Sequence, residues 1–92
     1  MRRYSISVEE LDAQSAEAGR KMSFSVENHD DIFAIVNRLQ SGGAVPAAEA
    51  EEFALGLKLF SEVVIRHRAE PLFSEVFGDI ARFIKRLKAE AR

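Results

Sequence analysis

Residues 22–36 change their hydrophobic period midway, and this change constrains the fold more than any other feature of the chain. Residues 22–27 alternate strictly between apolar and polar side chains, as in a strand with one buried face. After Asp31, apolar residues recur at helical spacing, at Ile32, Phe33, Ile35, Val36 and Leu39. A strand that leads directly into a helix indicates a mixed α and β fold.

A second alternating segment covers residues 3–10, with Tyr4, Ile6 and Val8 on one face and serine or glutamate on the other. The strand predicted over 21–27 has the same scheme. Two one-sided strands of this kind should pair antiparallel, burying one face and exposing the other to water. Residues 11–21 between the strands are too many for a tight turn, and we expect a mobile loop there.

Three helices are predicted after the hairpin, over about 29–40, 46–68 and 71–88. Asn28 is a favoured N-cap residue for the first helix, and Gly42 and Gly43 should end it, because glycine readily adopts the left-handed conformation of a helix terminus. Pro46 suits the first turn of the second helix. Pro71 should separate the second helix from the third, which has the strongest helical periodicity in the chain.

The second predicted helix has an apolar arc and a polar face. The arc consists of Phe53, Leu57, Phe60, Val63 and Val64, and the polar face consists of Glu51, Lys58, Glu62 and Arg66. Gly56 within the arc indicates the close approach of a neighbouring helix or strand. Leu55 and Ile65 fall on or beside the polar face and add slight weight to self-association.

This order of elements predicts an α+β domain in which an N-terminal antiparallel β-hairpin packs against three α-helices. An isolated hairpin is marginally stable in water, so its apolar face should lie on the helices. Two strands also leave two open edges, which a four-stranded sheet across a homodimer would reduce. We therefore predict a homodimer.

Length and composition exclude several classes of function. Ninety-two residues make one small domain with a single modest core. The absence of cysteine excludes disulfides, thiolate catalysis and cysteine-based zinc sites. No apolar run approaches the ~18 residues of a membrane span, and no apolar signal-peptide core follows the basic N-terminus. We expect a soluble cytoplasmic protein with no membrane partner.

A cluster of polar residues at the start of the first helix is the nearest approach to a metal or acid–base site. It comprises Asn28, His29, Asp30 and Asp31, and His67 could contribute from the second helix. Consecutive residues point in diverging directions, and no recognised ligand spacing is present. We favour helix capping and dipole compensation, leave His29, Asp30 and His67 as weak ligand-site candidates, and expect no metal or cofactor.

Catalytic residues are not recognisable in the sequence. The glycine pair at 42–43 follows a helix rather than a strand and lacks the lysine of a phosphate-binding loop. The strand serines lack the glycine-flanked turn of a nucleophile elbow. His67 lies between Arg66 and Arg68 with no nucleophile or oxyanion site beside it, so a helix C-terminal role is the simpler interpretation. We therefore expect no enzymatic activity.

Four basic residues on the third predicted helix form a candidate partner surface: Arg82, Lys85, Arg86 and Lys88. Nucleic-acid-binding proteins use such stripes to contact phosphates. The sequence pI of about 5.7 and the absence of a recognised DNA- or RNA-reading motif favour an ordinary solvated helix face instead.

Three strings of the sequence are fairly specific as strings. They are residues 24–36 (FSVENHDDIFAIV), 56–63 (GLKLFSEV) and 71–73 (PLF). In these strings the chain resembles a family of small bacterial proteins known as domain of unknown function 3861, whose members have about this length and begin with a similar Arg-Tyr strand. The resemblance implies a bacterial, cytoplasmic, single-domain protein, and it carries over no catalytic or binding residue.

Three functional hypotheses stay open at this point. The favoured one is a non-enzymatic protein-interaction or regulatory module with an unknown partner, because catalytic constellations are missing while strand edges and charged helix faces are available. The second is a nucleic-acid-associated protein that uses the basic C-terminal helix face. The third is a small-ligand binder with a pocket between hairpin and helices, near Gly56 and His67.

Overall fold

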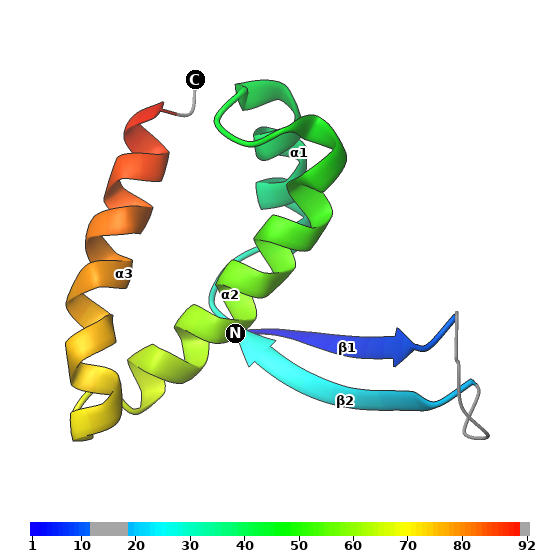
Figure 1. Cartoon of the computed structure of the whole chain (residues 1–92), viewed down its shortest axis with the longest axis horizontal. Coiled ribbons are helices and arrows are strands. Elements are labelled where there is room, and N and C mark those ends of the chain that lie inside the picture. Colours follow the sequence, from blue (N-terminus) through cyan, green and yellow to red (C-terminus); the bar gives the residue numbers. More distant parts are fainter. Residues whose placement is uncertain (12–18, 91–92) are drawn as a thin grey trace.

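A hairpin followed by three helices makes up the chain in the computed structural model, which describes residues 1–11 and 19–90 (Figure 1). The elements are β1 (Arg2–Glu9), β2 (Lys21–Asn28), α1 (Ile32–Gly42), the short 3-10 helix η1 (Ala47–Glu49), α2 (Ala50–Arg66) and α3 (Pro71–Glu90). The predicted α+β class and element order are confirmed. Most of the loop predicted over 11–21 lies outside the described residues.

The two strands pair antiparallel with one apolar and one polar face. Ile6 lies opposite Phe24 and Val8 opposite Met22 on the apolar face. On the polar face, Ser7 lies opposite Ser23, and the two hydroxyl oxygens are 3.0 Å apart. This register follows from the alternation of the sequence, because a shift by one residue would exchange the two faces of one strand.

Only the base of the hairpin packs on the helices. In Figure 1 the hairpin projects away from α2 on the side opposite α3. Tyr4, Ile6 and Val26 are half-buried near the base, whereas the side chains of the outer half are exposed: 48% for Val8, 59% for Met22 and 42% for Phe24. Strands of eight residues reach about 26 Å and extend beyond the helices that cover their base.

The core lies between α1 and α2. Leu39, Ala50 and Ala54 are buried, and Ile35, Val36, Val45, Phe53 and Leu87 pack around them. Helix α3, all of whose residues are described, runs antiparallel to α2 and diverges from it beyond the turn that joins them (Figure 1), and it contains no buried residue. The rings of Phe53 and Phe83, 6.1 Å apart, join α3 to this cluster. The apolar stripe of α3 is therefore only partly covered.

Helix α1 begins at Ile32 rather than near His29, and the predicted N-cap is wrong. Asp31 is the N-cap residue, because its carboxylate accepts a hydrogen bond from the backbone N–H of Ala34 at 3.2 Å. Asn28 is instead the last residue of β2 and makes contacts that hold it away from the helix. At the other end, Gly43 adopts the expected left-handed conformation with φ of 80°.

The bounds of α2 also differ from the prediction. One 3-10 turn follows Pro46, so that α2 itself begins at Ala50, and it ends at Arg66. Gly56 does not mark a close approach, because no atom of another element lies within 4 Å of the position that a Cβ atom would take. That prediction is therefore wrong, and Gly56 lies on an exposed part of the helix.

Candidate functional site

The junction between β2 and α1 is fastened to α2 by polar contacts. The side-chain N–H of Asn28 donates to the carbonyl oxygen of Lys58 at 3.1 Å, and its Oδ1 accepts from the N–H of Asp30 at 3.0 Å. The ammonium of Lys58 lies 2.9 Å from a carboxylate oxygen of Asp30. Glu62 lies 3.2 Å from Nδ1 of His29. The two longest strings of the family resemblance thus meet at this junction.

Tyr4 fixes the same junction from the other strand. Its hydroxyl donates to the carbonyl oxygen of Asp30 at 2.8 Å and accepts from the backbone N–H of Ile32 at 3.0 Å. Its ring lies 6.2 Å from that of Phe33. Because β1 and α2 both hold this turn, Asp30 and Lys58 have defined positions at the surface.

Lys58 and Glu62 do not lie on a wet face, as the helical wheel of α2 predicted. Their side chains are only 13% and 11% exposed, because the β2–α1 junction covers this side of the helix. Each carries its charge against a partner from the junction, Asp30 for Lys58 and His29 for Glu62. The middle of the polar face of α2 is therefore an internal contact with the β2–α1 junction, whereas Glu51 and Arg66 of the same face are exposed.

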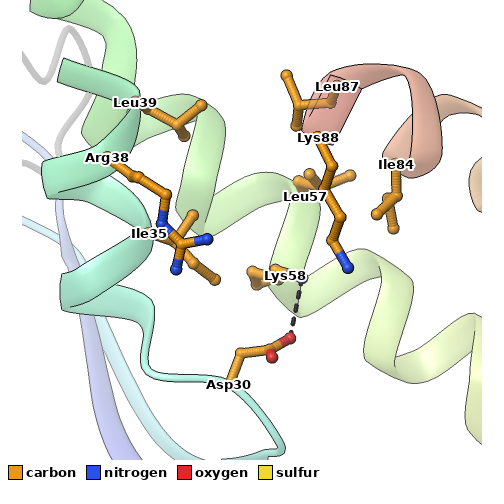
Figure 2. Close-up of a pocket in the computed structure, with 9 residues that line it drawn as sticks. All are labelled: Asp30, Ile35, Arg38, Leu39, Leu57, Lys58, Ile84, Leu87 and Lys88. Carbon is orange, nitrogen blue, oxygen red and sulfur yellow. Dashed lines mark ion pairs between the residues drawn. The ribbon is translucent and has the colours of Figure 1, made fainter. Parts of the chain in front are cut away.

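An open groove of about 160 Å³ runs from this junction between the three helices (Figure 2). Its walls are apolar and come from all three helices: Ile35, Leu39, Leu57, Ile84 and Leu87. Each helix also contributes one basic residue, namely Arg38, Lys58 and Lys88, and Asp30 is the single acid. We refer to these nine residues as the basic groove.

Charge in the basic groove is unbalanced. Its three basic residues and one acid give a net formal charge of +2. Lys58 is neutralised by Asp30, whereas neither Arg38 nor Lys88 forms an ion pair within the described ranges 1–11 and 19–90. Figure 2 shows the charged ends of Arg38 and Lys88 directed toward the end of the groove where Asp30 and Lys58 pair.

The Asp30 carboxyl responds to this surrounding charge. Its hydrogen bond with the ammonium of Lys58 lowers the pKa of Asp30 below its ordinary value. Partial burial acts in the opposite direction, and the charges of Lys58, Lys88 and His29 lower the pKa further. Asp30 therefore stays ionised, and its negative charge already balances that of Lys58. The positive charge left for a ligand belongs to Arg38 and Lys88.

The two histidines singled out in the sequence lie in separate ion pairs. His29 faces Glu62, whereas His67 lies at the end of α2 with its Nδ1 2.6 Å from Glu70 and its ring beside Phe73. Over residues 1–11 and 19–90, no group of three or more His, Cys, Asp or Glu side chains is placed to hold a metal ion. Of the three weak ligand-site candidates, only Asp30 lines the basic groove.

The basic stripe predicted on α3 is divided by its surroundings. Lys88 reaches the basic groove. Arg82 pairs with Asp79, and Arg86 lies 2.8 Å from Glu90, so that acids of the same helix balance both arginines. Lys85 is exposed and does not line the basic groove. The part of the stripe outside the groove is thus a weaker phosphate-binding surface than the sequence indicated.

Sequence analysis missed two of the three basic residues of the groove. Arg38 directly precedes the buried Leu39, and Lys58 directly follows Leu57 in the groove wall. A basic residue at the edge of an apolar stripe was the available signal, since its stem packs while its charge stays wet. That signal identifies single residues, but their convergence depends on how the three helices pack.

The fold and the groove together define a small α+β domain with a projecting hairpin and a basic cleft among its helices. The family described as "Domain of Unknown Function with solved-structure structure (DUF3861)" matches residues 2–89. The chain therefore belongs to this family, and the resemblance predicted from its strings is confirmed.

A solved structure has the same fold. It is the crystal structure of a protein of unknown function from Pectobacterium atrosepticum, and its TM-score against this chain is 0.81. The two sequences are 34% identical, and the match covers 96% of this chain and 97% of the other. Comparison with curated proteins finds no match. Within the described ranges, no helix combines the length and the apolar character needed to cross a membrane. These comparisons support the fold and assign no activity.

Proposed function

We propose that this protein is a non-enzymatic interaction module whose basic groove binds an acidic amphipathic helix of a partner protein. One observation carries this proposal. Arg38 and Lys88 come from different helices and bring positive charge, which no acid within residues 1–11 and 19–90 pairs, to the two sides of an apolar groove. A ligand that matches both features has apolar side chains flanked by carboxylates.

The size of the groove favours a helix over a small molecule. Pockets for drug-sized ligands are about 300–1,000 Å³, whereas this groove measures about 160 Å³. A cavity of about 150 Å³ holds one benzene-sized group. The groove therefore accommodates one or two side chains of a ligand that extends beyond it, as in helix-in-groove recognition.

The basic residues of the groove would make this recognition selective for acidic helices. Leucine or phenylalanine anchors spaced three or four residues apart would contact Ile35, Leu57 and Leu87. Asp or Glu beside the anchors would meet Arg38 and Lys88, and the Arg38 guanidinium can bind a carboxylate through two hydrogen bonds. Exposed charges of this kind contribute mainly to association rate and specificity, while the anchors supply most of the affinity.

A displayed library of helix-forming peptides tests this proposal without knowledge of the natural partner. Selection on the wild-type protein, with depletion on the Arg38→Glu/Lys88→Glu double variant, should enrich peptides with paired apolar anchors and flanking Asp or Glu. Enriched peptides without an excess of acidic residues, or peptides that bind the double variant equally well, would contradict the proposal.

Two single variants of α3 provide a matched comparison. Lys88→Glu reverses a charge in the basic groove, and Lys85→Glu makes the same change at an exposed position of the same helix that does not line the groove. By fluorescence anisotropy, Lys88→Glu should weaken binding of an enriched acidic peptide about tenfold, or about 1.4 kcal/mol. Lys85→Glu should weaken it less than about twofold. Equal losses would indicate nonspecific attraction by the whole helix.

The same variants distinguish nucleic-acid binding from the binding of an acidic helix. A mobility-shift assay with duplex DNA and single-stranded RNA at two salt concentrations reports phosphate contacts, because their affinity falls steeply as salt rises. We expect no salt-dependent shift at low micromolar protein. A shift lost in Lys85→Glu but retained in Lys88→Glu would instead favour nucleic-acid binding by the exposed basic residues of α3 outside the groove.

A further inference from the structure

The outer half of the hairpin presents an apolar face that none of the described residues covers. Val8 and Met22 form one cross-strand pair on it, and Ile6 and Phe24 form the next. Val8, Met22 and Phe24 are each more than two-fifths exposed. The opposite face carries serine pairs that suit water. A two-stranded hairpin with one uncovered apolar face is marginal on its own.

The surface of the whole chain indicates how much cover is missing. Its accessible area is 7060 Å², whereas a compact monomer of 10.3 kDa exposes about 5,400 Å². The radius of gyration is 15.4 Å, against about 12 Å for a compact chain of this length. A standard interface removes about 800 Å² from each partner. The excess of about 1,700 Å², which the hairpin shares with the partly covered α3, is larger than one partner's share of such an interface.

Two ion pairs join the strand ends next to the loop of the hairpin. Glu9 pairs with Lys21 at 3.4 Å, and Glu10 pairs with Arg20 at 2.8 Å. Glu9 and Glu10 are thus each matched by a base of the same hairpin. These four residues carry no net charge, so they do not oppose the contact of two apolar faces.

We infer that a second copy of this chain covers the hairpin, so that two apolar hairpin faces pack against each other in a homodimer. Such a contact is isologous, because each copy offers the same patch. The apolar face continues at its base into a groove lined by Ile6, Phe33 and Leu55, which lengthens the patch available to the partner copy. This contact is independent of the basic groove, which lies between the helices.

Mass in solution is the first test of this inference. Sedimentation equilibrium of the full chain at micromolar concentration should give twice the chain mass of 10.3 kDa. A mass equal to one chain at that concentration would overturn the homodimer.

Neighbouring residues of β2 then locate the interface. Met22→Lys places a charge on the apolar face and should give a monomer, whereas Ser23→Lys makes a similar change on the polar face and should leave the dimer intact. Both positions are exposed, so both variants should fold, which circular dichroism verifies. A folded Met22→Lys dimer, or an equal loss in both variants, would place the interface elsewhere.

Discussion

Asn28 illustrates how one polar side chain determines where two elements meet. It is 1% exposed, and its amide both donates to the Lys58 carbonyl and accepts from the Asp30 N–H. Aspartate has nearly the same shape but no N–H to donate, and it would place a negative charge beside a carbonyl oxygen. Position 28 therefore requires the hydrogen-bonding groups of an amide, and a side chain of the same shape is not sufficient.

Asn28→Asp should therefore lower the free energy of unfolding by about 1–3 kcal/mol, the cost of an unsatisfied buried polar contact. Urea denaturation at pH 7 measures this loss. Asn37→Asp, the same change on an exposed part of α1, should alter stability by less than about 0.5 kcal/mol. Similar losses of unfolding free energy in the two variants would show that the contacts of Asn28 add no stability beyond that of an exposed asparagine.

The Asp30–Lys58 pair gives stability a defined pH dependence. Since Lys58 lowers the pKa of Asp30, the contribution of the pair is present above the unfolded-state pKa near 4 and is lost as pH falls through the folded-state value. Asp30→Asn should destabilise the protein by up to about 1 kcal/mol at pH 7, because the carboxylate is half exposed. Urea denaturation over a series of pH values should show this difference shrinking as the pH falls below the unfolded-state pKa of Asp30. A difference that grows with acidity would contradict the assignment.

Residue-level prediction from the sequence succeeded only for local roles. Gly43 ends α1 in the left-handed conformation that the sequence predicted, whereas the predicted N-cap was Asn28 and the observed one is Asp31. The partner of Asn28 is a backbone carbonyl thirty residues away. Any residue at position 58 offers such a carbonyl, so no side-chain pattern could indicate it.

At the scale of elements, periodicity predicted the type of both strands and of α1, α2 and α3, but not the 3-10 helix η1, and tertiary contacts moved the ends of the elements. The N–H of Asp30 is taken by Asn28, and that of Ile32 by the Tyr4 hydroxyl. These contacts hold the chain out of the helix as far as Asp31, so that α1 starts later than its composition indicated. The residue at which a helix begins thus depends on which groups of the protein satisfy the backbone N–H groups around its N-terminus.

Gly56 offers a test at the same scale. Nothing of another element lies within 4 Å of its missing Cβ, and it sits in the interior of α2. Gly56→Ala should therefore raise the free energy of unfolding by about 0.5–1 kcal/mol, because glycine in a helix loses more conformational freedom. Chemical denaturation measures the gain. A destabilised Gly56→Ala protein would reveal a neighbour in solution that the single chain lacks.

The whole molecule is more open than its sequence implies. The regular stripe of α3 is typical of a helix buried on one face, yet that face is only partly covered and forms a wall of the basic groove. Amphipathic spacing indicates that a face will be covered but not by what. The hairpin face and the basic groove are both such surfaces, and we assign the first to a second copy and the second to a partner helix.

Association should also be visible in thermal unfolding. If two copies cover each other's hairpins, mass action raises the Tm of the wild-type protein with protein concentration. Met22→Lys should have a lower Tm that does not depend on concentration, whereas Ser23→Lys should behave as wild type. A concentration-independent wild-type Tm would contradict the homodimer.

Methyl NMR with selectively labelled isoleucine and leucine tests the proposed function most directly. Titration with an enriched acidic peptide should shift the methyl signals of the groove residues Ile35, Leu57, Ile84 and Leu87, while those of Ile6 in the hairpin stay in place. Shifts centred on the hairpin, or uniform small shifts across the protein, would show that the basic groove is not the binding site.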